Sequence, residues 1–156
     1  MSYHNILVPY DKSQSAKNAL EEALGLSSGS EGSKVTVLNV TDIPNFNDAT
    51  FEVAARMSGV SNLETVETEK LEKNYVAAVM SDIETDTADI TAGKHDRLEF
   101  AVAHGKPSRA IVSYANDHDC DLIVMGCRGL SAVSGMLGSV SYAVLRGADC
   151  PVMVVK

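Results

Sequence analysis

Short apolar, β-branched runs alternate with helical patterns along most of the chain. A continuous apolar run is typical of a strand buried on both faces, and apolar positions three or four residues apart predict one face of a helix. Strands are predicted at residues 3–9, 34–40, 98–103, 121–125 and 151–155. Helices are predicted from about residue 13, from residue 63, after residues 105–108, and at residues 138–146.

The stretch between the second predicted strand and the long helix has no clear period. Pro44, Asn45 and Asn47 interrupt it, and a short helix at residues 51–57 is the one element that it suggests. A connection of this length without regular structure is typical of a functional or mobile loop. We interpret residues 41–62 in this way.

Strands that alternate with helices predict βαβ units, and therefore an open, mostly parallel α/β sheet with helices on both faces. A chain of 156 residues has the usual length of one domain, so residues 1–156 are predicted to form a single domain. In such sheets, ligands bind beyond the carboxyl ends of the strands, where the strand order reverses. A site is therefore expected just after Val8, Val40, Val102 and Met125.

Composition excludes several other classes of protein. The chain has 13 basic and 21 acidic residues, a net charge of -8, and no Trp. A protein that binds nucleic acid needs a basic face or stacking aromatics, so none is expected as a partner. Three cysteines without a CxxC pair argue against a disulfide framework and a structural zinc site. Neither a signal peptide nor a membrane span is indicated, and we expect a cytoplasmic protein.

The segment after the fourth predicted strand carries the strongest candidate chemistry. It contains Gly126-Cys127-Arg128-Gly129 and, after eight further residues, Gly138-Ser139-Val140-Ser141. Glycines after a buried strand let backbone N–H groups approach a phosphate, and free N–H groups at a helix start favour an anion. The hydroxyls of Ser139 and Ser141 add donors, and Arg128 adds a cation. A flexible glycine loop with an ordinary serine N-cap explains the same residues equally well.

Asp11 directly follows the first predicted strand. Its carboxylate is suited to accept a hydrogen bond from a ribose hydroxyl or to bind Mg²⁺ at the sheet edge. It is also well placed to cap the first helix. The two roles do not exclude each other.

Five segments, in order, resemble the universal stress protein superfamily in its nucleotide-binding branch. The resemblance covers nearly the whole chain apart from residues 41–97. Its segments are an opening strand with a Pro-x-Asp-x-Ser turn at 5–13, a second strand at 37–40, a βα junction at 102–111, a strand at 121–126, and the C-terminal part at 138–152.

The resemblance implies an adenine nucleotide alpha hydrolase-like fold, with five parallel strands in the order 3-2-1-4-5. It also implies ATP at the carboxyl edge of the sheet, together with Mg²⁺ or Mn²⁺ held by Asp11. The site residues that it implies are Pro9, Tyr10 and Asp11 near the adenosine, the Val40 backbone at the adenine, Met125 and Gly126 at the base and ribose, and Arg128, Gly129, Gly138, Ser139, Val140 and Ser141 at the phosphates.

One feature departs from the family pattern. Eight residues separate Gly129 from Gly138, one fewer than in the nucleotide-binding members. One residue moves a helical backbone by about 100° and 1.5 Å, so this loop must adopt a conformation of its own. The main hypothesis is an ATP-binding sensor or signalling protein with little turnover. The alternatives are a nucleotide-free dimeric interaction module of the same family and, less favoured, an adenylate-transfer enzyme, which would lack a second domain for the acceptor.

The last predicted strand, residues 151–155, is apolar and lies at the edge of the sheet in the implied order. An uncovered edge strand presents unpaired N–H and C=O groups. Pairing with a second copy across a two-fold axis covers them, and the family resemblance implies the same arrangement. We therefore predict a homodimer through the C-terminal strand, with a monomer as the alternative.

Overall fold

The computed structural model describes residues 2–29, 31–42, 65–130 and 136–156, together with isolated positions between 49 and 59. The short helix predicted at 51–57 and most of the 41–62 loop lie outside the described residues. The strands are β1 (Asn5–Pro9), β2 (Lys34–Thr41), β3 (Leu98–His104), β4 (Leu122–Gly126) and β5 (Val152–Val155). The helices are α1 (Gln14–Ser28), α3 (Thr65–Thr91), α4 (Pro107–Asp117) and α5 (Ser139–Gly147), with a short 3-10 helix at His95–Arg97.

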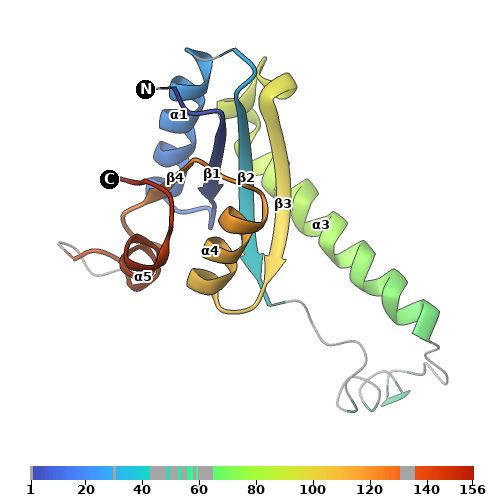
Figure 1. Ribbon diagram of the computed structural model, residues 1–156. Coiled ribbons are helices and arrows are strands. Elements are labelled where there is room, and N and C mark those ends of the chain that lie inside the picture. Colours follow the sequence, from blue (N-terminus) through green and yellow to red (C-terminus); the bar gives the residue numbers. More distant parts are fainter. Residues whose placement is uncertain are drawn as a thin grey trace.

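The strands form one parallel sheet in the order β3-β2-β1-β4-β5, which confirms the predicted fold (Figure 1). The chain moves from β1 through β2 to β3 on one side, and then crosses to β4 and β5 on the other. The strand order therefore reverses between β1 and β4, where a ligand site is expected in an open α/β sheet.

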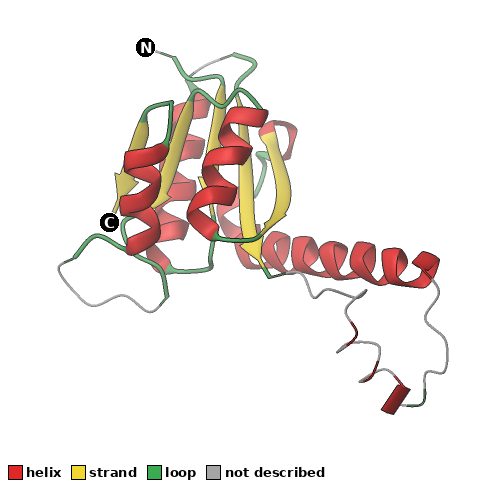
Figure 2. Cartoon of the chain, turned by 60° about the horizontal axis from the view of Figure 1, so that its bottom comes forward, coloured by secondary structure: helices red, strands yellow, loops and turns green. Residues whose placement is uncertain are grey.

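Helices cover both faces of the sheet, and each face has its own apolar core (Figure 2). Alternate residues of β1 point to opposite faces, as the pleat requires. Ile6 and Val8 pack with α1 and with Ile83 of α3, whereas Leu7 packs with Ile111 of α4 and Val144 of α5. All six residues are buried. The continuous apolar runs of the sequence therefore reflect strands that are buried on both faces.

Ser13, and not Asp11, is the N-cap of α1. Its hydroxyl accepts a hydrogen bond from the amide of Ala16 at 3.2 Å. Asp11 accepts one from the amide of Ser13 at 3.0 Å instead, in the turn that leads into the helix. The prediction that Asp11 caps the first helix is therefore wrong. Among the described residues, the other carboxylate oxygen of Asp11 accepts no hydrogen bond from an amide of α1.

Helix α3 packs on the sheet with its C-terminal half, and its N-terminal half extends away from the strands (Figures 1 and 2). Ile83, Thr87 and Thr91 are buried, whereas the side chains from Lys70 to Asn74 are exposed. No helix among the described parts of the chain combines the length and the apolarity needed to cross a membrane.

Helix α1 approaches the sheet closely at Gly126, the last residue of β4. A Cβ atom placed there would lie 2.4 Å from Ser15 Oγ, 2.8 Å from the Ser15 carbonyl carbon and 2.9 Å from the Ala16 amide nitrogen. Two of these atoms belong to the backbone of α1 and have little freedom to move. Gly126 therefore has a packing role as well as its place in the candidate site.

We predict that Gly126→Ala lowers the free energy of unfolding by about 1–3 kcal/mol, because its methyl group overlaps the first turn of α1. Gly25→Ala is the matched control, since Gly25 lies inside α1 with nothing within 4 Å of its Cβ position. That change should raise the free energy of unfolding by about 0.5–1 kcal/mol. Urea denaturation measures both values, and equal effects would contradict the packing role of Gly126.

Candidate functional site

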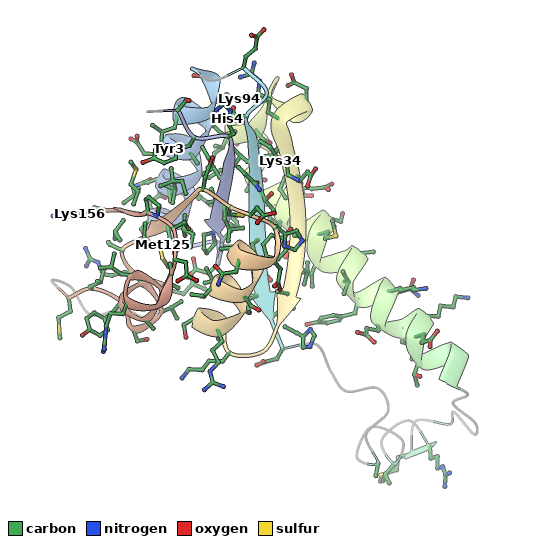
Figure 3. All side chains as sticks on the ribbon, in the orientation of Figure 1. Tyr3, His4, Lys34, Lys94, Met125 and Lys156 are labelled. Atoms are coloured by element: carbon green, nitrogen blue, oxygen red, sulfur yellow. The ribbon has the colours of Figure 1, made fainter. Side chains whose placement is uncertain are left out.

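A cavity of about 500 Å³ opens at the carboxyl ends of β1, β2 and β4, where the strand order reverses. Figure 3 shows Met125, one of its lining residues, well away from Tyr3 and His4 at the opposite end of β1. Every site residue predicted from the sequence borders this cavity. These are Pro9, Tyr10, Asp11, Val40, Met125, Gly126, Arg128, Gly129, Gly138, Ser139, Val140 and Ser141.

The sequence-based prediction missed several apolar residues of the lining. Leu38 of β2 and Pro107 and Ile111 of α4 border the cavity, as do Leu130 and Leu137 of the connection between β4 and α5. The sequence predicts a strand that contains Leu38 and a helix that contains Pro107 and Ile111. Their position at the carboxyl edge of the sheet was the signal that could have identified them, but it does not distinguish a core residue from a lining residue.

Pro9 determines where the cavity begins. Pairing between β1 and β4 ends at Leu7 and Ile123, whereas β1 and β2 remain paired through Pro9 and Leu38. Proline has no amide hydrogen and cannot donate to the next carbonyl of β4. The two central strands therefore separate at Pro9, on the side where the strand order reverses.

Among the described residues, no hydrogen-bond partner is seen for the main-chain N–H and C=O of Val40, which borders the cavity. The Tyr10 amide donates to the Leu38 carbonyl at 2.8 Å, which is the last main-chain bond between β2 and the chain leaving β1 in the described structure. Along a parallel strand, the N–H and C=O of alternate residues point to the same neighbour. Those of Val40 therefore point beyond the end of β1. The Tyr10 carbonyl, their next partner in the ladder, accepts from the side chain of Asn39 at 2.9 Å instead.

The start of α5 forms the opposite wall of the cavity. Gly138 is the N-cap, so the alternative of a serine N-cap is wrong, and Ser139 is the first helical residue. The Gly138 amide donates to the Cys127 carbonyl at 2.8 Å, which ties the loop to the end of β4. The first hydrogen bond within the helix comes from Tyr142. The amides of Ser139, Val140 and Ser141 therefore have no acceptor within α5, and those of Ser139 and Val140 are the first two at its start.

Ser141 has a structural role that the sequence did not indicate. Its hydroxyl donates to the Gly126 carbonyl at 2.8 Å, and the residue is buried. The prediction that this hydroxyl is a free donor for a phosphate is not met by this arrangement. Ser141 instead fixes the first turn of α5 against the end of β4.

Asp11 and Arg128 are the cavity-lining side chains of the described chain that carry a charge at neutral pH. A Cβ atom on Gly129 would lie 2.8 Å from Asp11 Oδ2, so Asp11 faces the loop after β4 at close range. The Arg128 carbonyl accepts from the hydroxyl of Ser15 at 2.6 Å, which holds this loop on α1. In the described parts of the chain, no group of three or more His, Cys, Asp or Glu residues is arranged to bind a metal ion.

Tyr10 borders the cavity, but its ring packs in the core and its hydroxyl forms a hydrogen bond with α3. The ring is 2% exposed and packs in the core beneath α1 and α3. Its hydroxyl donates to Asp86 of α3 at 2.5 Å, and Lys17 of α1 contacts the same carboxylate at 3.2 Å. Burial, together with the neighbouring Asp86, raises the pKa of Tyr10 well above its ordinary value. The hydrogen bond from Tyr10, with Lys17, lowers the pKa of Asp86 below its ordinary value.

Comparison with known proteins gives a consistent result. A family model described as "Universal stress protein family" matches residues 2–156. A universal stress protein of Synechocystis sp. is 30% identical over 164 residues, covering 100% of this chain and 99% of the relative. The solved UspA of Lactobacillus plantarum has a TM-score of 0.73 at 24% identity and covers 100% of this chain and 99% of its own. The universal stress protein of Archaeoglobus fulgidus, solved in complex with dAMP, has a TM-score of 0.58 at 22% identity, with 100% of both chains covered.

We predict that Tyr10→Phe lowers the free energy of unfolding at pH 7 by about 1–2 kcal/mol, because an ionised acceptor loses its donor. The pKa of Asp86 is depressed in the folded state, so this stabilisation is present above the ordinary carboxyl pKa of 3.8. It is lost as the pH falls through the lower pKa of the folded protein.

Urea denaturation at pH 7 and at pH 3 measures this dependence. Tyr3→Phe is the control, because Tyr3 packs against the same core and no hydrogen bond of its hydroxyl is seen among the described residues. A difference between wild type and Tyr10→Phe that does not shrink on acidification would contradict a bond to ionised Asp86.

Proposed function

The chain belongs to the universal stress protein family, and on that premise we propose that it binds an adenine nucleotide in the cavity beyond β1, β2 and β4. The observation that carries this proposal is the N–H and C=O pair of Val40 at the cavity edge, for which the described residues provide no partner. The nucleotide that we propose is ATP, bound with Mg²⁺ or Mn²⁺.

The main chain of Val40 supports adenine rather than guanine. Adenine presents a ring acceptor, N1, beside an amino donor, and these complement an N–H and a C=O on one strand edge. Guanine presents a donor at N1 and an acceptor at O6, which is the reverse pattern. The apolar lining residues, including Leu38, Ile111 and Met125, form a surface suited to the faces of the base.

The start of α5 supports binding of the phosphates. The available amides of Ser139 and Val140 and the helix dipole favour an anion there. The hydroxyl of Ser139 adds a donor, and Arg128 adds a positive charge at the same wall. Gly138 allows this approach, because its Cβ position already lies 3.3 Å from the Cys127 carbonyl oxygen.

The carboxylate of Asp11 fits the ribose or a divalent cation. Mg²⁺ in nucleotide sites is commonly held by one or two carboxylates, phosphate oxygens and water, rather than by a complete protein cage. One carboxylate beside the phosphate wall meets that requirement. The metal would neutralise phosphate charge when it is bound with the nucleotide.

We assign little turnover to this site and infer a sensor or signalling role. Rapid phosphoryl transfer requires several charged groups around the transferred phosphate and a residue that positions water. Within the described lining, Asp11 and Arg128 alone carry charge. The alternative function is a nucleotide-free dimeric module. It is favoured by the shortened loop between Gly129 and Gly138, and by the engagement of the Gly138 amide with Cys127.

The proposal predicts that ATP with Mg²⁺, at about 100 times its dissociation constant, stabilises the fold by about 2.7 kcal/mol. This corresponds to a rise in melting temperature of about 5–10 °C, which differential scanning fluorimetry measures. GTP should give a much smaller rise, because its base presents the reverse pattern to Val40. No rise with millimolar ATP would favour the nucleotide-free module.

Ser139→Ala separates the two ends of the ligand in the same assay. It should reduce the shift produced by ATP and leave the shift produced by adenosine unchanged. Ser113→Ala, on the exposed face of α4, is the matched control and should change neither. If Ser139→Ala reduced the melting-temperature shifts from ATP and from adenosine equally, Ser139 would not contact the phosphates.

We also propose a homodimer through β5, which pairs with β4 alone among the described strands. The amides of Ile123 and Cys127 donate to the Pro151 and Val155 carbonyls, so the N–H and C=O groups of the alternate residues, Val152 and Val154, point outward. These outward groups are suited to pair with the same strand of a second copy.

Val154→Pro removes one outward amide hydrogen without touching the bonds to β4, and should convert the dimer into a monomer. Light scattering should give a mass near twice 16.6 kDa for the wild type and near 16.6 kDa for this variant. Val102→Pro makes the same change on β3, at the other edge of the sheet, and should leave the mass doubled. A monomeric wild type at micromolar concentration would overturn this assembly.

A further inference from the structure

The turn between β1 and α1 is held from outside the cavity by two carboxylates of α3. Tyr10 donates its hydroxyl to Asp86, and Lys12 forms an ion pair with Asp82. Asp82 and Asp86 are four residues apart and therefore lie on one face of the helix. Asp11, between Tyr10 and Lys12 in the sequence, lines the cavity instead.

The backbone of this turn is unusual at Lys12. Its φ is +67°, in the left-handed region that residues with a Cβ atom seldom adopt. Such a conformation persists only where surrounding contacts hold it. It allows Tyr10 and Lys12 to point toward α3 while Asp11 points away.

Hydrogen bonds to β2 hold only the start of the turn. The main chain of Tyr10 is bonded to Leu38 and to Asn39, both of β2. Beyond Tyr10, the Lys12–Asp82 pair reaches α3. The loop after β4 is reached by Asp11 Oδ2, which faces Gly129, and by the hydroxyls of Ser13 and Ser15, which donate to the Arg128 carbonyl at 3.4 and 2.6 Å. The loop after β4 and helix α3 therefore both restrain this turn, and α3 holds the residues on either side of Asp11.

We infer that Asp86 and Asp82 are positioning residues for the nucleotide, acting through Tyr10 and Lys12 to hold Asp11 at the ribose or the metal. This inference rests on the proposed nucleotide site. Asp86 has the larger role, because its side chain is partly buried, with an exposed fraction of 28%, and because it also binds Lys17. The exposed fraction of the Asp82 side chain is 63%, so solvent weakens its pair with Lys12.

Asp86→Ala tests the inference in the full-length chain, with nucleotide binding measured by isothermal titration calorimetry. The dissociation constants of ATP and of adenosine should both rise about five- to tenfold, as expected when a charge-assisted bond that orders a site is lost. Asp89→Ala is the matched control: it removes the same charge from an exposed position of α3 and should change neither constant. The joint loss distinguishes this variant from Ser139→Ala, which affects ATP alone.

A rescue experiment separates positioning from general destabilisation. Asp82→Ala should weaken ATP about two- to threefold, and adding Lys12→Gly should restore most of the affinity, because glycine adopts a positive φ without support. Urea denaturation of wild type and Asp82→Ala is the control: loss of affinity without a matching fall in the free energy of unfolding supports positioning, and a parallel fall overturns it.

The outcomes distinguish this inference from the proposed function. If wild type binds no nucleotide, both are overturned. If wild type binds ATP and Asp86→Ala binds it equally well, the site stands and the positioning role is overturned. Failure of Lys12→Gly to restore affinity likewise overturns a role of Asp82 through the turn.

Discussion

The cavity depends on one missing hydrogen-bond donor in the central strand. β1 lies between β2 and β4, and Pro9 ends its pairing with β4 two residues before its pairing with β2 ends. The main chain then turns away from the sheet at Tyr10, and β2 continues past it paired with β3 alone. This asymmetric ending leaves the groups of Val40 without partners in the ladder. A residue with an amide hydrogen at position 9 would allow the two central strands to remain paired further toward the cavity.

The part of the cavity formed by the end of β4 and the start of α5 depends on close main-chain packing. Gly126 allows α1 to approach, Gly138 allows α5 to approach, and the buried hydroxyl of Ser141 joins α5 to the Gly126 carbonyl. Two helix starts that are distant in sequence, those of α1 and α5, are thereby held in contact with the end of one strand. The first-turn amides of α5 consequently have a fixed direction, which lowers the ordering cost of binding an anion.

The sequence predicted the parallel α/β sheet from local periodicity, and the family resemblance supplied the strand order 3-2-1-4-5. Short apolar and β-branched runs identified all five strands, and glycine and proline at the strand ends identified the loops at the carboxyl edge. The errors arose where two nearby residues were equally able to play one role. Asp11 and Ser13 are both good N-cap residues, and only the path of the turn decides between them. The same applies to Ser139 and Gly138 at α5. The hydrogen bond from Tyr10 to Asp86 joins residues 76 positions apart, and the bond from Ser141 to Gly126 joins residues 15 positions apart. No local sequence pattern encodes either bond.

The electrostatics of the site are compatible with the anionic ligand that we propose, although the chain is acidic. The net charge of -8 repels a nucleotide at long range, but salt screens this repulsion beyond about 8–10 Å. Close to the cavity, the nearby acidic side chains of α3 are paired with Lys12, Lys17 and the Tyr10 hydroxyl on the far side of the β1 turn. The wall formed by α5 presents the positive end of a helix dipole together with Arg128. A ligand at that wall therefore meets local donors, while the acidic surface of α3 is partly neutralised by the same contacts that hold the turn in place.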